Sequence, residues 1–225
     1  MRPSYGTFNQ VFGIAYVVLM TNALLTVACL PLVVALFATD LSSSWPLLAL
    51  LAPLCAPALV SAYTVFAVYT EEGTVDVART FARAWRSQLR RSLAVGAPTV
   101  GVLVVLAVDV RAVWESRVGA LAIPFFATVA VLTAATATLA LVGVVERPEV
   151  RVRALVRAAL YLAVRRWYLS AASLVVLGLL VGVVATRPAP GLGLAAAPLL
   201  YAVWANSRYA MRPVLHADAP TPVPA

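Results

Sequence analysis

The chain has 225 residues, of which 63% are hydrophobic and only 12% are charged. A soluble globular domain has about half apolar and about a quarter charged residues, so this composition excludes an ordinary soluble domain and also a disordered chain. The net charge of +8 comes from seventeen arginines and no lysine. In so apolar a chain, excess arginine is typical of loops on the cytoplasmic side of a membrane, and we expect no nucleic-acid partner.

The sequence contains six apolar segments that we interpret as membrane spans, since a helix needs about 20 apolar residues to cross the hydrocarbon core. They cover about 11–38, 45–69, 92–108, 119–145, 167–185 and 191–207. The first is longer than needed and contains Pro31, which predicts tilt or a kink. The second follows Ser44, a predicted N-cap, and contains Pro53 and Pro57, which predict irregular structure. The last is the weakest, because it is short and contains Pro198.

These segments predict an all-α, polytopic transmembrane helical bundle with a single domain over 1–212 and a disordered Pro- and Ala-rich tail over 213–225. With both termini in the cytoplasm, fourteen of the seventeen arginines lie on the inner side, as the positive-inside rule requires. A five-span alternative would move Arg208 and Arg212 to the outside and weaken this asymmetry.

The first inner loop has the pattern of an amphipathic helix over about 74–91. Its apolar positions recur at helical spacing and share one face: Val75, Ala78, Phe81, Ala82, Trp85 and Leu89. Four arginines flank that face: Arg79, Arg83, Arg86 and Arg90. We expect this helix to lie at the membrane surface, with its arginines near anionic head groups. The alternative is that the arginines serve only to set the topology.

The second inner loop predicts a helix over about 148–166 that ends in Arg165 and Arg166, next to an aromatic anchor at Trp167. The pair Arg90–Arg91 precedes the third span as Arg165–Arg166 precedes the fifth, so the two loops resemble a diverged repeat. The sequence thus proposes one candidate surface for a partner or for lipid head groups: Arg79, Arg83, Trp85, Arg86, Arg90, Arg91, Arg165 and Arg166.

Groups that carry out catalysis or bind metals are scarce. His216 lies in the tail without other ligands, and Cys29 and Cys55 lie in apolar runs without a partner pattern, so we expect no metal, cofactor or enzyme activity. Ionisable residues are absent from the middle of the spans, which argues against proton-coupled transport. Asn22 and Asn206 are candidate intramembrane polar contacts; for Asn22 we expect an interhelical hydrogen bond, with a polar substrate as the alternative.

Several stretches resemble the YesL-like family of bacterial membrane proteins. They include Phe81-x-Arg83-Ala84-Trp85-Arg86, Arg90-Arg91-Ser92-Leu93 and Leu200-Tyr201-x-x-Trp204, the last resembling the actinobacterial branch. The resemblance implies a multi-pass protein of the bacterial cytoplasmic membrane, encoded beside carbohydrate ABC transporters. It implies no catalytic residues. We therefore predict a non-enzymatic accessory or interaction component linked to carbohydrate uptake, with a permease-like transport subunit for a small polar solute as the alternative.

Overall fold

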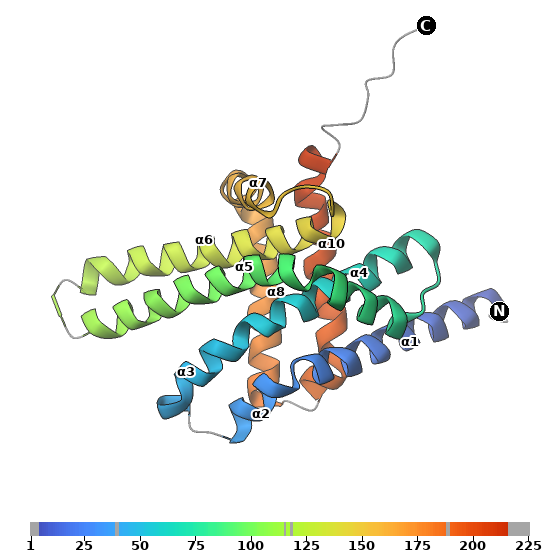
Figure 1. Ribbon diagram of the computed structural model, residues 1–225, viewed down its shortest axis with the longest axis horizontal. Helices are drawn as coiled ribbons and strands as arrows, with labels where there is room; N and C mark the ends of the chain where they lie inside the picture. The colour runs from blue at the N-terminus through green and yellow to red at the C-terminus, as the bar shows by residue number, and fades with distance from the viewer. Residues whose placement is uncertain (1–4, 39–40, 115, 118, 188–189, 216–225) are drawn as a thin grey trace, which may run out of the picture.

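The computed structural model describes residues 5–38, 41–114, 116–117, 119–187 and 190–215, and every regular element in this part of the chain is helical (Figure 1). The elements are α1 (Tyr5–Ala28), α2 (Leu30–Ala38), α3 (Leu41–Leu51), the 3-10 turn η1 (Ala52–Leu54), α4 (Cys55–Glu72), α5 (Val77–Val113), α6 (Gly119–Glu146), α7 (Val152–Arg165), α8 (Trp167–Thr186), the π-helical turn η2 (Gly191–Ala195) and α10 (Ala196–Leu215). The predicted all-α class is confirmed.

Four stretches in the described part of the chain are long and apolar enough to cross a membrane: Ser44–Glu72, Val77–Val113, Gly119–Glu146 and Trp167–Thr186. The bent pair α1–α2 makes a fifth if it counts as one span. The segment 191–207 is not among them, so a sixth span remains a prediction. The helix there, α10, extends to Leu215, past the predicted domain end at 212, and the rest of the predicted tail lies outside the described residues.

Three prolines predicted a kink or irregular structure in the first two spans: Pro31 and Pro53 lie at breaks between helices, whereas Pro57 lies inside the regular helix α4. α1 and α2 meet at an angle of 64° around Cys29, because Pro31 has no N–H with which to continue the helical hydrogen bonds. In the second span, Pro53 lies in the 3-10 turn η1 that separates α3 from α4. The N-cap predicted at Ser44 is wrong: α3 begins at Leu41, and Ser44 lies inside it.

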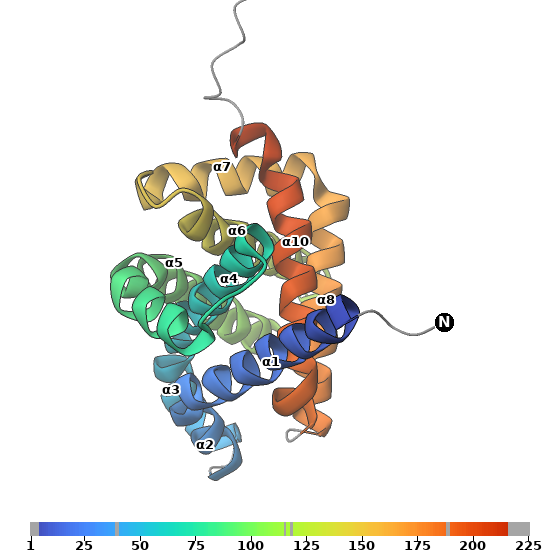
Figure 2. The ribbon, with the colours of Figure 1, turned by 90° about the vertical axis from the view of Figure 1, so that its right-hand side faces the viewer.

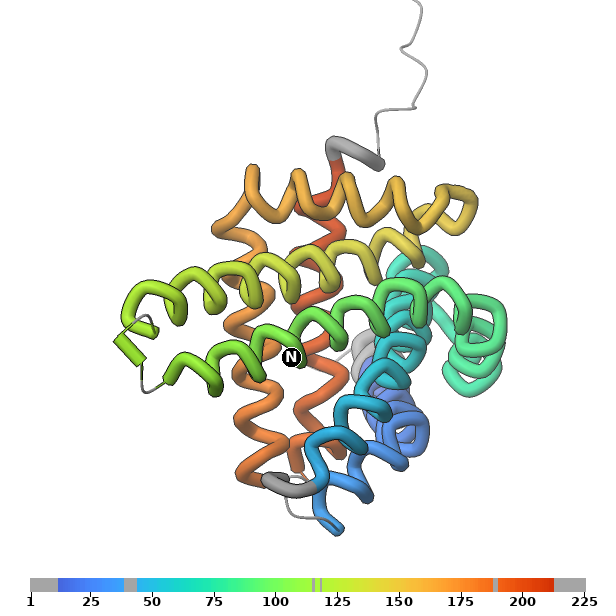
Figure 3. The backbone as a smooth tube through the Cα atoms, turned by 60° about the vertical axis from the view of Figure 1, so that its left-hand side comes forward, coloured from blue at the N-terminus to red at the C-terminus, as the bar shows by residue number. Residues whose placement is uncertain are grey.

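The predicted surface helix and the third span form one continuous helix, α5. Gly73 ends α4 with a left-handed φ of 75°, which glycine adopts without steric cost. Asp76 then caps α5 by accepting a hydrogen bond from the Arg79 N–H at 3.2 Å. Figure 3 shows that α5 changes direction between its arginine-bearing first part and its apolar second part. Where the arginine-bearing sequence passes into the apolar sequence, the Ser92 hydroxyl donates to the Gln88 carbonyl at 2.9 Å.

The last helix is the centre of the bundle. α5 and α6 run antiparallel beside each other, while α8 and α10 form a second pair that crosses them (Figure 1). Figure 2 shows α10 upright in the middle of the molecule with α1 passing across it, and α10 contacts α1, α4, α6, α7 and α8. Its Trp204 and Met211 are fully buried, together with Tyr63 of α4 and Val142 of α6. A helix with two arginines can lie here because other helices, rather than lipid, cover its apolar side.

Candidate functional site

Four arginines on the first part of α5 form a row that we call the α5 arginine face: Arg79, Arg83, Arg86 and Arg90. All four are exposed, and the Arg79 side chain is 76% exposed, with a long ion pair of 3.7 Å to Asp76. In the described part of the chain, the other three side chains make no hydrogen bond and no ion pair. The arginine face is therefore available for binding.

The opposite side of this helix packs into the protein. Phe81 and Ala84 are buried, and the half-buried ring of Trp85 stacks on Phe81 with centroids 6.4 Å apart. Protein therefore covers this apolar side at Phe81 and Ala84, whereas Ala82, placed on the same side by its spacing, is exposed. Periodicity identifies an apolar face, but it does not distinguish a lipid covering from a protein covering.

Arg91 does not belong to the exposed arginine face; its side chain binds the backbone of another part of the protein. Its half-buried guanidinium donates hydrogen bonds to the backbone carbonyls of Arg147 at 3.3 Å, Val150 at 2.6 Å and Pro148. These carbonyls follow the C-terminal end of α6, where the helix dipole favours a cation. Arg91 thus fixes the turn between α6 and α7 against α5, and it joins the two arginine-rich loops.

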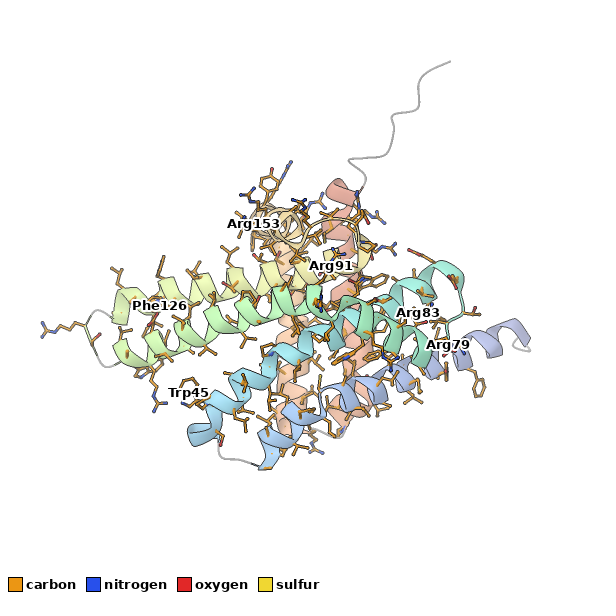
Figure 4. The ribbon with its side chains drawn as sticks, in the orientation of Figure 1. Trp45, Arg79, Arg83, Arg91, Phe126 and Arg153 are labelled. Carbon is orange, nitrogen blue, oxygen red and sulfur yellow. The ribbon has the colours of Figure 1, made fainter. Side chains whose placement is uncertain are left out.

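The two arginines at the end of α7 differ in the same way. Arg165 is exposed and donates only to its neighbour, the Tyr161 hydroxyl, at 2.9 Å. Arg166 is half-buried, donates to the Tyr209 carbonyl at 3.3 Å and lies 6.0 Å from that ring. Figure 4 shows Arg79 and Arg83 on α5 and Arg153 on α7, far from Phe126 at the other end of α6.

The two candidate asparagines tie helices together. Asn22, only 1% exposed, donates to the Gly193 carbonyl at 2.9 Å and accepts from the Ala197 N–H at 2.6 Å. It therefore links α1 to η2 and α10. Asn206 donates to the Leu169 carbonyl and to the Ser173 hydroxyl, both at 2.7 Å, and links α10 to α8. The amide groups of both side chains are engaged within the protein.

A charged cluster on α10 is the feature that the sequence did not single out. Arg208 Nη2 lies 2.9 Å from Glu71 Oε1, and Arg208 Nε lies 3.1 Å from Glu146 Oε2. The guanidinium is also 5.2 Å from the Trp204 ring centre. One arginine thus joins the ends of α4, α6 and α10. The sequence shows a carboxylate at the end of each of two predicted spans, Glu71 and Glu146. Their shared partner, Arg208, lies far along the chain, so no local pattern connects the three residues.

Beside this cluster is a cavity of about 470 Å³, which we call the α10 pocket. Its lining comes from the ends of α4, α6 and α10: Thr70, Glu146, Arg147, Tyr201, Trp204, Ala205, Arg208, Tyr209 and Arg212. The Tyr201 ring packs between Phe66 and Trp204, with centroids 5.5 Å from each. The pocket combines aromatic faces with charged groups held in fixed positions.

The two cysteines are neighbours, although no spacing pattern in the sequence pairs them. Both are free thiols, and their sulfur atoms are 3.6 Å apart. Cys29 lies at the bend between α1 and α2, and Cys55 begins α4 directly after η1. Within the described ranges, no three His, Cys, Asp or Glu side chains converge on a place that could hold a metal ion.

Comparison with known proteins gives one similarity. A family model described as a protein of unknown function, DUF624, matches residues 14–110. No curated protein and no solved structure matches the chain. The matched segment contains most of α1, all of α2 to α4 and most of α5, and so includes the α5 arginine face but not the α10 pocket. Over this segment the chain is similar to a family without an assigned activity.

Proposed function

We propose that the protein is a non-enzymatic component of the bacterial cytoplasmic membrane that acts by binding a membrane partner through the α5 arginine face. The observation that carries this proposal is the contrast between the two sides of one helix. Phe81 and Ala84 are locked in the core, whereas Arg83, Arg86 and Arg90 are exposed without partners among the described residues. A fixed row of unpaired positive charges attracts an acidic surface.

The anionic lipid head groups of the inner leaflet are one acidic surface that the α5 arginine face would contact. Each arginine near an anionic leaflet contributes about 1 kcal/mol, so four arginines orient the first part of α5 against head groups. α7 carries two further exposed arginines, Arg153 and Arg157. An acidic surface on a neighbouring membrane protein competes for the same side chains.

The link to carbohydrate uptake is the finer part of the proposal. It rests on the resemblance to the YesL-like family, in which neighbouring genes encode carbohydrate ABC transporters. Of the motif residues that carry this resemblance, Arg83 and Arg86 lie at the α5 arginine face, whereas Trp85 stacks on Phe81 on the packed side of the helix. We therefore propose the membrane subunits of a carbohydrate ABC transporter as the docking partner.

The test replaces Arg79, Arg83, Arg86 and Arg90 with glutamine in the full chain. Crosslinked native membranes are solubilised, and the transporter subunits that co-purify are quantified by mass spectrometry, while carbonate extraction measures membrane insertion. We expect transporter recovery to fall at least about five-fold with insertion unchanged, since four charges leave the interface. Replacement of Arg111, Arg117 and Arg187, exposed on the opposite ends of the helices, serves as the matched control.

Unchanged recovery in the fourfold variant, with normal insertion, would refute docking through this face. The alternative prediction, a permease-like subunit for a small polar solute, has its own test. Purified protein in sealed vesicles would then carry out solute uptake, alone or with an added ATPase.

A further inference from the structure

A groove on the surface of the bundle lies between α5 and α7 and is completed by α6. We call it the α5–α7 groove. Its volume is about 660 Å³, which falls within the range of small-molecule sites. Its lining is mostly aliphatic, and the one charged side chain in that lining is Arg153, near the start of α7. The groove is therefore apolar along its length and positively charged at one place.

The groove has the length of one leaflet of a bilayer. Its lining follows α6 from Ala140 to Val129, which is about 16 Å at about 1.5 Å per residue. Half of a hydrocarbon core about 30 Å thick is about 15 Å. α5 runs antiparallel to α6, so Val102 of α5 lines the same end of the groove as Val129. An extended acyl chain fits along this stretch.

Two arginines lie beside the groove on one face of α7. Arg153 and Arg157 are four residues apart in the helix, so their side chains are neighbours on its surface. Leu160 continues the same face. It lines both the groove and a smaller hollow of about 420 Å³, which Arg157 also lines. Figure 4 shows Arg153 on α7, above α6.

Both of these arginines are available for an anion. They are exposed, and in the part of the chain that the structure describes neither makes a hydrogen bond or an ion pair. Glu149, four residues before Arg153, pairs with Arg147 at 3.6 Å instead. Adjacent guanidinium groups repel each other, and a phosphate between them relieves the repulsion while accepting hydrogen bonds from both.

Helix α7 is apolar on two sides. Leu155 and Ala159 are buried in the bundle, whereas Leu160, Tyr161 and Val164 are 44%, 59% and 60% exposed. Exposed apolar side chains next to arginines are typical of a helix at the boundary between acyl chains and head groups. At this depth the apolar side chains contact the acyl chains, and the guanidinium groups reach the phosphates.

We propose that the α5–α7 groove binds one anionic phospholipid of the inner leaflet. One acyl chain lies along α5 and α6, and the phosphate lies between Arg153 and Arg157. The apolar lining and its length fit the chain, and the unpaired arginines fit the charge, as in other basic sites between membrane helices. This site is separate from the α5 arginine face, so it does not depend on transporter docking.

The test locates the lipid by photocrosslinking. The full chain is placed in phosphatidylcholine nanodiscs that contain a trace of phosphatidylglycerol with a diazirine on its acyl chain. After irradiation, mass spectrometry of peptides identifies the labelled residues, and increasing amounts of unlabelled phosphatidylglycerol measure the affinity. A second arm uses photoreactive phosphatidylcholine with the same chains. Val175 of α8, 71% exposed, reports contact with the bulk lipid.

We expect the phosphatidylglycerol probe to label Val102 and Leu160 at least about five-fold more than the phosphatidylcholine probe, and both probes to label Val175 equally. Arg153→Gln combined with Arg157→Gln should weaken binding at least about ten-fold, because hydrogen bonds to a charged acceptor are lost. The matched control, Arg111→Gln combined with Arg117→Gln, removes two exposed arginines from the far end and should leave binding unchanged.

A second pair of variants tests the apolar part of the groove. Val102→Trp places a large ring in the lining and should reduce labelling of Leu160 by phosphatidylglycerol at least about ten-fold. Val105→Trp makes the same change at a residue of α5 that is 58% exposed and lies outside the groove lining, so labelling should not change. All substituted side chains are exposed or partly exposed, and thermal unfolding checks that each variant is folded.

Equal labelling of the groove by the two probes would overturn the proposal, because it would indicate bulk lipid only. Unchanged affinity in the variant without Arg153 and Arg157 would also overturn it, and so would a dimer in which a second copy of the chain covers the groove. The fourfold glutamine variant of the α5 arginine face should keep full labelling of the groove. Failure of transporter docking is therefore distinguishable from failure of this lipid site.

Discussion

Asn22 shows what one buried amide contributes inside the bundle. Its side chain satisfies a carbonyl at Gly193 and an N–H at Ala197, both around the π-helical turn that begins the last helical segment. We predict that Asn22→Leu lowers the stability by about 1–2 kcal/mol, because the Ala197 N–H loses its partner. Thermal unfolding in detergent measures this loss.

Thr26→Val is the control for that measurement. The Thr26 hydroxyl donates to the Asn22 carbonyl within the same helix, at 2.9 Å, so its removal breaks no link between helices. A Tm drop for Thr26→Val as large as that for Asn22→Leu would contradict a special role for the asparagine.

The cysteine pair gives a second prediction at this scale. Sulfur atoms 3.6 Å apart come within bonding distance by small side-chain rotations. Treatment with copper phenanthroline should therefore link Cys29 to Cys55 within one chain. Maleimide-polyethylene glycol added after denaturation would then label neither thiol, whereas the Cys29→Ser variant keeps one label. Full labelling of both thiols after oxidation would contradict the observed arrangement of the first bend against α4.

Residue types were easier to predict than their partners. A polar Asn22 in an apolar run indicates a hydrogen bond, but its partners lie more than 170 residues away, where no local pattern can identify them. Arg90 and Arg91 are adjacent and identical in sequence. They point about 100° apart around the helix, so one is exposed and the other binds the α6–α7 turn.

At the scale of elements, the contact between α4 and α5 depends on a glycine. A side-chain carbon at Gly96 would lie 2.5 Å from the Ala56 side chain, so Gly96→Ala must push the helices apart. We predict a loss of about 1–3 kcal/mol, as for other overpacked sites. Gly101, on the same helix, has open space around it, and Gly101→Ala should leave Tm unlowered. Equal Tm values for the two variants would exclude this close approach.

The positions of helix breaks followed from proline, but the continuity of α5 did not follow from hydropathy. Pro31 and Pro53 lack the backbone N–H that helical hydrogen bonding needs. This property belongs to the residue type, so it can be read directly from the sequence. Near Ser92 the sequence changes from arginine-rich to apolar, because the surroundings of the side chains change there. A helical backbone does not need to end at such a change. The helix α5 continues through Ser92, whose hydroxyl donates to the Gln88 carbonyl within the same helix.

For the whole molecule, the arginine distribution predicts which ends share a side. Arg208, Glu71 and Glu146 meet, so the ends of α4, α6 and α10 that carry them lie together. In a cysteine-free background, Ser116→Cys should react with a membrane-impermeant maleimide from outside intact cells. Glu149→Cys should react only after the cells are opened. Labelling of both positions from the same side would refute the proposed orientation.

The ion cluster also has a consequence for assembly. Glu71 and Glu146 are synthesised and inserted long before Arg208, the cation that both of them contact. Until α10 packs into the middle of the bundle, the two carboxylates lack this counter-ion. For Glu146, whose side chain is only 9% exposed in the finished protein, burial without it is costly. A nascent or truncated chain that ends before α10 is therefore distinguishable from the finished protein by its unneutralised acids. Quality-control proteases that recognise incompletely packed helices would encounter such chains before α10 covers the ends of α4 and α6.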